Sequence, residues 1–206
     1  MYALVTDGTI TKYFNNPKGF TLGDLQYPKD IFMKWSVEEK EAIGIYEVVF
    51  DDSNKKDDKW YINTNQSFAF ADGTVTASYG TATAKAHADT TWSQDDEDAG
   101  DLPDDKSVND IKTRGLKYNL IQTIKQQAAG LLAPTDWYVI KANEIEDYTV
   151  PTNITTFRAL VRSKSNTIET QIKNATNTPA LETLYTYTTT DGVQSRPLAE
   201  LPTLEI

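Results

Sequence analysis

Residues 107–137, SVNDIKTRGLKYNLIQTIKQQAAGLLAPTDW, contain the pattern that decides the predicted fold. Their apolar residues recur every three or four positions, which places the side chains on one face of an α-helix. These residues are Val108, Ile111, Tyr118, Ile121, Ile124, Ala128 and Leu131. Ser107 and Asp110 are typical of a helix start, and Ala133-Pro134 of a helix end. The pattern predicts one long helix, in which Gly115 would let a neighbouring helix approach closely.

A second apolar stripe of the same period begins after Pro151–Asn153. Its members are Ile154, Phe157, Val161, Ile168, Ile172 and Ala175. Lys164 and Ser165 interrupt it midway. Two such stripes joined by a loop predict an antiparallel helical hairpin, or helices that form a coiled coil in an oligomer.

Upstream of the helices the apolar pattern has a period of two, which is typical of strands. Asp7-Gly8 and Asp72-Gly73 each separate two alternating segments and predict tight hairpins, because such turns need positive φ. Ser36-Val-Glu-Glu39 matches a capping box and predicts one short helix. Gly44 would end this helix, and Ile45–Phe50 would follow as a strand.

The acidic run Asp95-Asp-Glu-Asp98 is followed closely by Asp101, Asp104 and Asp105. Like charges repel and few apolar groups are present, so this segment is predicted to be a linker. Helix signals are absent from Thr178 onward, which predicts an extended tail that buries little by itself. The predicted fold class is α+β: a small antiparallel β domain with one short helix (1–92), an acidic linker (93–106), a two-helix hairpin (107–177) and an extended tail (178–206).

Composition limits the possible partners. The 206 residues carry a net charge of -10, which disfavours nucleic acid and anionic membranes as partners. No apolar run approaches the ~20 residues of a membrane span, and Met1–Thr6 is too short and polar to be a signal peptide. The absence of cysteine excludes disulfides, thiolate nucleophiles and Cys-ligated zinc. We expect no membrane insertion.

The sequence shows no recognisable catalytic motif. The one histidine, His87, lies at the end of an Ala-rich predicted strand, and catalysis would require an orienting partner and a nucleophile beside it. The acidic run offers oxygen ligands for calcium, but the spacing of an EF-hand loop is absent. No particular pair of acids suggests glycoside hydrolysis. We therefore expect no enzyme activity, no cofactor and no bound metal.

Aromatic residues are numerous in the predicted β region. Trp60, Tyr61, Tyr79 and Trp92 have three interpretations: core residues, a protein interface, or a surface on which sugars stack.

The junction of the two predicted helices resembles a known family. The string Leu131-Leu-Ala-Pro-Thr-Asp-Trp137 precedes a helix that contains Phe157-Arg158-Ala-Leu160. This order is similar to the helical region of tail and tail-fibre-assembly-type proteins of tailed bacteriophages. The matching positions are Leu131, Leu132, Ala133, Thr135, Asp136, Trp137, Phe157, Arg158 and Leu160. Pro134 replaces a residue that is usually charged, and the connector is longer and less regular than usual.

The N-terminal part is similar in style to marine-phage virion proteins. The resemblance is carried by Phe20-Thr-Leu-Gly-Asp-Leu25, Tyr27-Pro28 and Gly44-Ile-Tyr-Glu-Val48, in that order. The resemblance implies a phage tail protein and supplies no catalytic residues. On physical grounds Leu131 and Leu132 would staple the helix end, Asp136 would cap a turn, and Trp137 would plug the open end of the hairpin.

We expect a structural component of a virion tail (an adaptor, baseplate or tail-fibre attachment subunit) that is made in the host cytoplasm and retained in the particle. Its expected partners are other tail proteins and copies of itself around a symmetry axis. The extended C-terminal segment (178–206) suits permanent docking, which favours this structural role over the first alternative, a tail-fibre assembly chaperone. A receptor- or glycan-binding fibre domain and an enzyme are the others. The candidate interface residues are Ile111, Tyr118, Ile121, Ile124, Leu131, Trp137, Phe157, Val161, Ile168, Ile172, Tyr185 and Tyr187.

Overall fold

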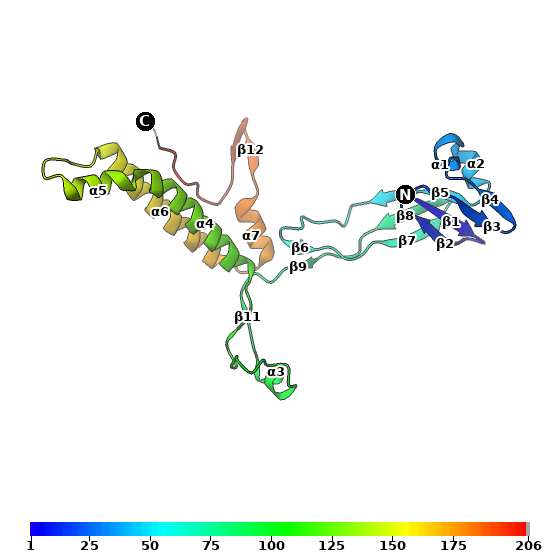
Figure 1. Cartoon of the computed structure of the whole chain (residues 1–206), viewed down its shortest axis with the longest axis horizontal. Helices are drawn as coiled ribbons and strands as arrows, with labels where there is room; N and C mark the ends of the chain where they lie inside the picture. Colours follow the sequence, from blue (N-terminus) through cyan, green and yellow to red (C-terminus); the bar gives the residue numbers. More distant parts are fainter. Residues whose placement is uncertain (205–206) are drawn as a thin grey trace. The chain divides into compact units, whose positions relative to one another are not determined.

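The structure, a computed structural model, describes residues 1–204 and is an α+β protein with an N-terminal sheet and C-terminal helices (Figure 1). The predicted fold class is confirmed. The chain divides into two compact units, Met1–Thr83 and the segment from Ala84 to the C-terminus. The predicted boundary in the acidic run is therefore wrong, because residues 93–106 lie inside the second unit.

A five-stranded sheet with the order β2-β1-β5-β8-β7 forms the centre of the first unit. Its strands are β1 (Tyr2–Thr6), β2 (Thr9–Phe14), β5 (Ile45–Asp51), β7 (Ser67–Ala71) and β8 (Thr74–Ser78). Strand β1 pairs antiparallel with β2 and β5, and β7 with β8, whereas β5 and β8 are parallel. The prediction of an antiparallel β domain is therefore wrong for the pair of β5 and β8. A short ladder of β6 (Tyr61–Ile62) and β9 (Thr83–Ala84) lies outside the sheet.

Both predicted hairpin turns are present. Asp7 and Gly8 have φ of 51° and 74°, and Asp72 and Gly73 have φ of 50° and 73°. Positive φ at both central residues is the type I′ geometry, whose twist matches that of the flanking strands. These turns set the register in which β1 meets β2 and β7 meets β8.

The sheet buries side chains on both of its faces. Alternating residues point to opposite sides of a strand, so neighbours along β1 enter different cores. One core contains Leu4, Phe14, Phe20, Ile31, Phe32 and Ile45, and the other contains Ala3, Val5, Val48, Val75 and Ala77. In the first core the Phe14 ring centroid lies 4.9 Å from that of Phe20 and 5.3 Å from that of Phe32.

The residues that cover the first of these cores follow β2 in the chain. They form β3 (Phe20–Leu22), β4 (Leu25–Tyr27), α1 (Ile31–Lys34) and α2 (Val37–Glu41). The unit thus has two short helices where one was predicted. Helix α2 starts at the predicted capping box: Ser36 Oγ accepts from the Glu39 N–H at 3.2 Å, and Glu39 Oε2 accepts from the Ser36 N–H at 2.8 Å.

The second unit is built on two long helices. Its helical elements are α4 (Leu116–Leu132), the 3-10 turn η1 (Ala133–Thr135), α5 (Asp136–Glu144), α6 (Thr152–Asn174) and α7 (Thr178–Tyr185). Lys117, at the start of α4, donates from Nζ to the carbonyl of Lys173, near the end of α6, at 2.8 Å. Ala128, near the end of α4, packs with Phe157, near the start of α6. Helices α4 and α6 therefore form an antiparallel hairpin within one chain (Figure 1).

The first predicted helix starts later than its apolar stripe suggests. Residues 107–110 form a turn in which the Ser107 N–H donates to Asp110 Oδ2 at 2.8 Å, but no helix starts at this turn. Instead β11 (Ile111–Thr113) pairs with β10 (Thr90–Thr91). The acidic run between these two strands contains the helix α3 (Gln94–Asp98), so it is not the structureless linker that was predicted.

Gly115 allows a close approach, but not by the partner that was predicted. A Cβ atom there would lie 2.3 Å from the Ala88 carbonyl carbon and oxygen. The neighbour is therefore the strand-end backbone of the same unit and not a helix. Asp89 fixes this approach, because its Oδ1 accepts from the Gly115 N–H at 2.7 Å and its Oδ2 pairs with Arg114 at 2.6 Å.

The C-terminal segment is docked on the chain's own helices, so the prediction of a tail that buries little is wrong. Leu181 of α7 and Leu198 beyond it are buried. Gln171 of α6 holds the backbone on both sides of Leu198: its Nε2 donates to the Pro197 carbonyl and its Oε1 accepts from the Ala199 N–H, each at 2.9 Å. In the chain between Leu181 and Leu198, the strands β12 (Thr188–Thr190) and β13 (Val193–Ser195) form an exposed hairpin. Residues 205–206 of the predicted tail lie outside the described part of the chain.

A pH titration tests whether the acidic run is ordered as described. Lys112, at 2.5 Å, and the backbone N–H and hydroxyl of Ser93 hold the pKa of Asp96 at about 2, below its ordinary value of 3.8. A lowered carboxylate pKa stabilises the folded form of the acidic run above pH 3.8, and this contribution to stability is lost as the pH falls towards 2. The Ser93 amide resonance in NMR spectra should therefore titrate with a midpoint near 2, and Asp96→Asn should abolish the transition. A midpoint at the ordinary value would contradict the described hydrogen bonds.

Candidate protein-binding surface

The predicted interface residues fall into three groups. Five are buried within the chain itself: Ile124, Phe157, Val161, Ile168 and Ile172. Ile121, Leu131 and Tyr185 are half-buried. Ile111, Tyr118, Trp137 and Tyr187 are exposed. The first group completes the packing inside the α4–α6 hairpin and beneath the C-terminal segment, so those side chains are not available to a partner.

Ser165, which was predicted to interrupt the stripe of the second helix, is buried along it. The stripe of α6 is therefore continuous from Ile154 to Ile172, and a small hydroxyl side chain fills its middle. Lys164, the residue before it, is exposed as expected for a charged residue.

Arg158 links the two halves of the string that resembles phage tail proteins. Its Nη1 lies 3.1 Å from the Leu132 carbonyl oxygen, 2.6 Å from Thr135 Oγ1 and 2.7 Å from Asp136 Oδ1. The Arg158 side chain is only 11% exposed, and Thr135 is buried. One guanidinium thus ties α6 to the point where α4 ends and α5 begins. Arg158 is not among the predicted interface residues, although its place in the family-like string was a usable signal.

Two roles predicted for this string are wrong. Asp136 does not cap a turn; it pairs with Arg158. Trp137 does not plug the end of the hairpin, because half of its surface is exposed. Its ring instead lies against that of Tyr138, with the centroids 3.9 Å apart.

Helix α5 carries large apolar side chains into solvent where the sequence predicted a connecting loop. None of its nine residues is buried. Trp137, Val139 and Ile140 are 50%, 44% and 56% exposed, and Ile145, just after the helix, is 47% exposed. At 100° per residue the first three lie on one side of the helix, within about 160°. These four side chains are called the α5 surface below.

The α5 surface has an acidic border. Glu144, Glu146 and Asp147 lie on either side of Ile145 at the C-terminal end of the helix, and all three are exposed. The nearest base in sequence, Lys141, lies over the rings of Tyr148 and Trp137, at 4.2 Å and 5.6 Å from their centroids. Carboxylates at a helix C-terminus face the negative end of the helix dipole, which is an unfavourable arrangement.

A hollow of about 300 Å³ adjoins Trp137. Its lining includes Tyr138, Pro151, Ile154 and Leu204, so its walls are mostly apolar. Burial of apolar side chains in such a hollow is chemistry suited to holding a protein segment.

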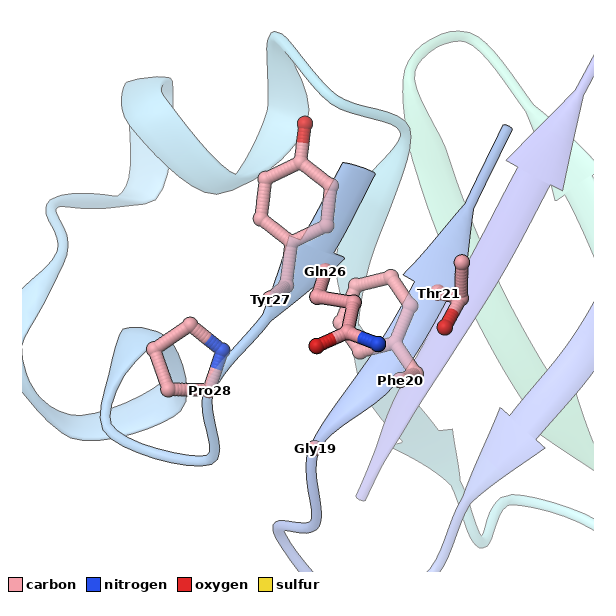
Figure 2. Close-up of a pocket in the computed structure, with 6 residues that line it drawn as sticks. All are labelled: Gly19, Phe20, Thr21, Gln26, Tyr27 and Pro28. Atoms are coloured by element: carbon pink, nitrogen blue, oxygen red, sulfur yellow. The ribbon is translucent and has the colours of Figure 1, made fainter. Parts of the chain in front are cut away.

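A second hollow lies on the β3–β4 hairpin of the first unit (Figure 2). It has a volume of about 460 Å³ and is lined by Gly19, Phe20, Thr21, Gln26, Tyr27 and Pro28. Phe20 is buried and stacks on Tyr27 at 5.3 Å between centroids. The lining contains no carboxylate, imidazole or amine, so the acid–base pairs that hydrolytic catalysis needs are not found in it.

Of the four aromatic residues with three interpretations, Trp60 and Tyr61 are buried, as the core interpretation requires. Tyr79 and Trp92 lie under Lys55 and Lys112, respectively.

Three further observations bear on other kinds of site. His87 is half-buried, and its carbonyl accepts from the Lys117 N–H. Within residues 1–204 no three His, Asp or Glu side chains are grouped so that they would hold a metal ion. Over the same range no helix is both long and apolar enough to cross a membrane.

Comparison with known proteins gives no relative. No protein-family model, no curated protein and no solved structure matches this chain. The case for a function therefore depends on the residues described above.

Proposed function

We propose that this chain is a non-enzymatic structural component of a phage tail, an adaptor, baseplate or tail-fibre attachment subunit, that acts through contacts with other tail proteins. The proposal has two supports. One is the resemblance of residues 131–137 and 157–160 to phage tail proteins. The other, which carries the proposal, is the α5 surface.

The α5 surface supports a binding function because such exposure is uncommon. Soluble proteins rarely leave neighbouring large apolar side chains in water unless the patch is an interaction site. A nine-residue helix is also too short to be stable alone. The contacts of Arg158 with Thr135 and Asp136 hold its first turn in place, so the exposure of Trp137 is not explained by a frayed end.

The division of the chain supports the adaptor role. Each unit has its own buried cluster, so each can hold its structure while it contacts a different neighbour. The net charge of -10 favours protein partners over nucleic acid. Copies of the chain around the tail axis are part of the proposal, since most homo-oligomers have closed symmetry.

The C-terminal segment does not support a permanent subunit. A free C-terminal arm would have favoured permanent docking, but the segment Arg196–Leu204 is held on the chain's own α6 by Gln171. The decisive experiment must therefore separate a virion subunit from a tail-fibre assembly chaperone, which leaves the finished particle.

Mass spectrometry of purified particles makes this separation. We expect the chain to co-purify with the particles of the phage that encodes it, at a constant ratio to known tail proteins across density-gradient fractions. An abundant host protein from the same lysate serves as the contamination control and should vary between fractions. Abundance in infected cells together with absence from particles would overturn the structural role and favour the chaperone.

A further inference from the structure

The charges that border the α5 surface indicate what kind of partner binds it. The surface combines the exposed side chains Trp137 and Ile140 with the adjoining hollow of about 300 Å³, which is wide enough to receive apolar side chains. The three carboxylates Glu144, Glu146 and Asp147 border it, and no ion pair of theirs is found among the described residues. A partner must therefore bring apolar groups to the centre and positive charge to the edge.

The position of these carboxylates also favours a cationic partner. They lie at the C-terminal end of α5, where the helix dipole already presents negative potential. The arrangement is unfavourable in the free chain, and a cationic neighbour would relieve it. Lys141 does not neutralise it locally, because its ammonium lies over the rings of Tyr148 and Trp137.

A second copy of the chain fits this surface poorly. In a two-fold contact the same patch meets itself, so three carboxylates from each copy would come together. Each copy also carries a net charge of -10.

We infer that the α5 surface binds a basic amphipathic segment of a different tail protein, one that places apolar side chains beside Trp137 and Ile140 and Lys or Arg beside Glu144, Glu146 and Asp147. This inference rests on the proposed function, because it assumes that the neighbour is a tail protein. It adds the surface and the chemistry of the partner.

Site-specific photo-crosslinking in assembled particles tests the inference. The full chain would carry benzoylphenylalanine in place of Ile140, and the control chain would carry it in place of Gln126, an exposed residue of α4. We expect position 140, and not position 126, to form an adduct with one other virion protein. Mass spectrometry of the linked peptide should find Lys or Arg within a few residues of the attachment point.

A charge variant tests the acidic border separately. The triple substitution Glu144→Gln, Glu146→Gln and Asp147→Asn keeps the size of each side chain and removes its charge. It should lower the yield of the adduct at position 140 by about tenfold at low salt. The far-UV circular dichroism spectrum should not change, since these side chains are exposed.

The outcomes distinguish this inference from the function on which it rests. Absence of the chain from particles would overturn the proposed function and this inference together. Presence in particles with no adduct at position 140, an adduct with a second copy, or a yield unaffected by the triple substitution would overturn this inference alone.

Discussion

Replacing Arg158 by alanine is expected to lower the free energy of unfolding of the second unit by about 2–4 kcal/mol. The guanidinium is nearly buried and contacts the Leu132 carbonyl, Thr135 Oγ1 and Asp136 Oδ1. Its removal leaves the Leu132 carbonyl and the buried Thr135 with fewer hydrogen bonds and opens a gap at the end of α4. Urea unfolding followed by circular dichroism at 222 nm would measure the change, because the long helices α4 and α6 both lie in this unit.

Arg162→Ala is the matched control for this prediction. Arg162 lies one turn further along α6, is exposed, and makes one long contact of 3.5 Å to the Arg158 carbonyl. Its substitution should change the free energy of unfolding by no more than about 0.5 kcal/mol. Equal effects of the two substitutions would mean that Arg158 is not the link between α6 and the junction of α4 and α5.

The features that local chemistry dictates were predictable from sequence. The Asp-Gly turns, the capping box at Ser36 and the period of two in β1 and β2 each depend on residues close in the chain. Gly44 belongs to the same class, because its φ of 80° is a backbone conformation that glycine adopts readily. Such signals need no knowledge of the rest of the fold.

The start of α4 could not be predicted in this way. Val108 and Ile111 continue the apolar stripe in sequence, and Ser107 with Asp110 forms the hydrogen bond expected of a helix start. The decisive contact is distant, because Gly115 packs on the backbone of Ala88 and its N–H is bound by Asp89. This approach places residues 111–113 beside β10 as a strand. A tertiary contact here overrides the local helical period.

The candidate site was predicted in part. The string from Leu131 to Trp137 drew attention to the end of the hairpin where the α5 surface lies, and Trp137 is exposed there. The run Trp137-Tyr-Val-Ile140 was an apolar signal for the α5 surface, but a nine-residue segment after a proline shows too little periodicity to identify a helix. Val161 is buried by its packing with Ala128 of α4, a contact between distant parts of the chain, and the docking of the C-terminal segment has no local signature in the sequence.

The docked C-terminal segment leads to the second large expected effect. Leu198→Ala should lower the free energy of unfolding of the second unit by about 2–5 kcal/mol, the usual range for emptying a buried leucine site. Leu198 is 1% exposed, its N–H donates to the Leu184 carbonyl at 3.0 Å, and Gln171 holds the backbone on both sides of it. Thermal and urea unfolding at 222 nm would measure the loss.

Leu160→Ala provides the comparison, because it removes the same atoms from an exposed position of α6 in the same unit. Its effect should stay within about 1 kcal/mol, since little apolar surface is uncovered. The two substitutions separate the two descriptions of the C-terminal region. If the C-terminal segment is loosely held, neither substitution should change the free energy of unfolding appreciably. If it completes the core of α6 and α7, only Leu198→Ala should lower the free energy of unfolding. If neither substitution changed the free energy of unfolding, residues 196–204 would be a free arm, and such an arm would favour permanent docking.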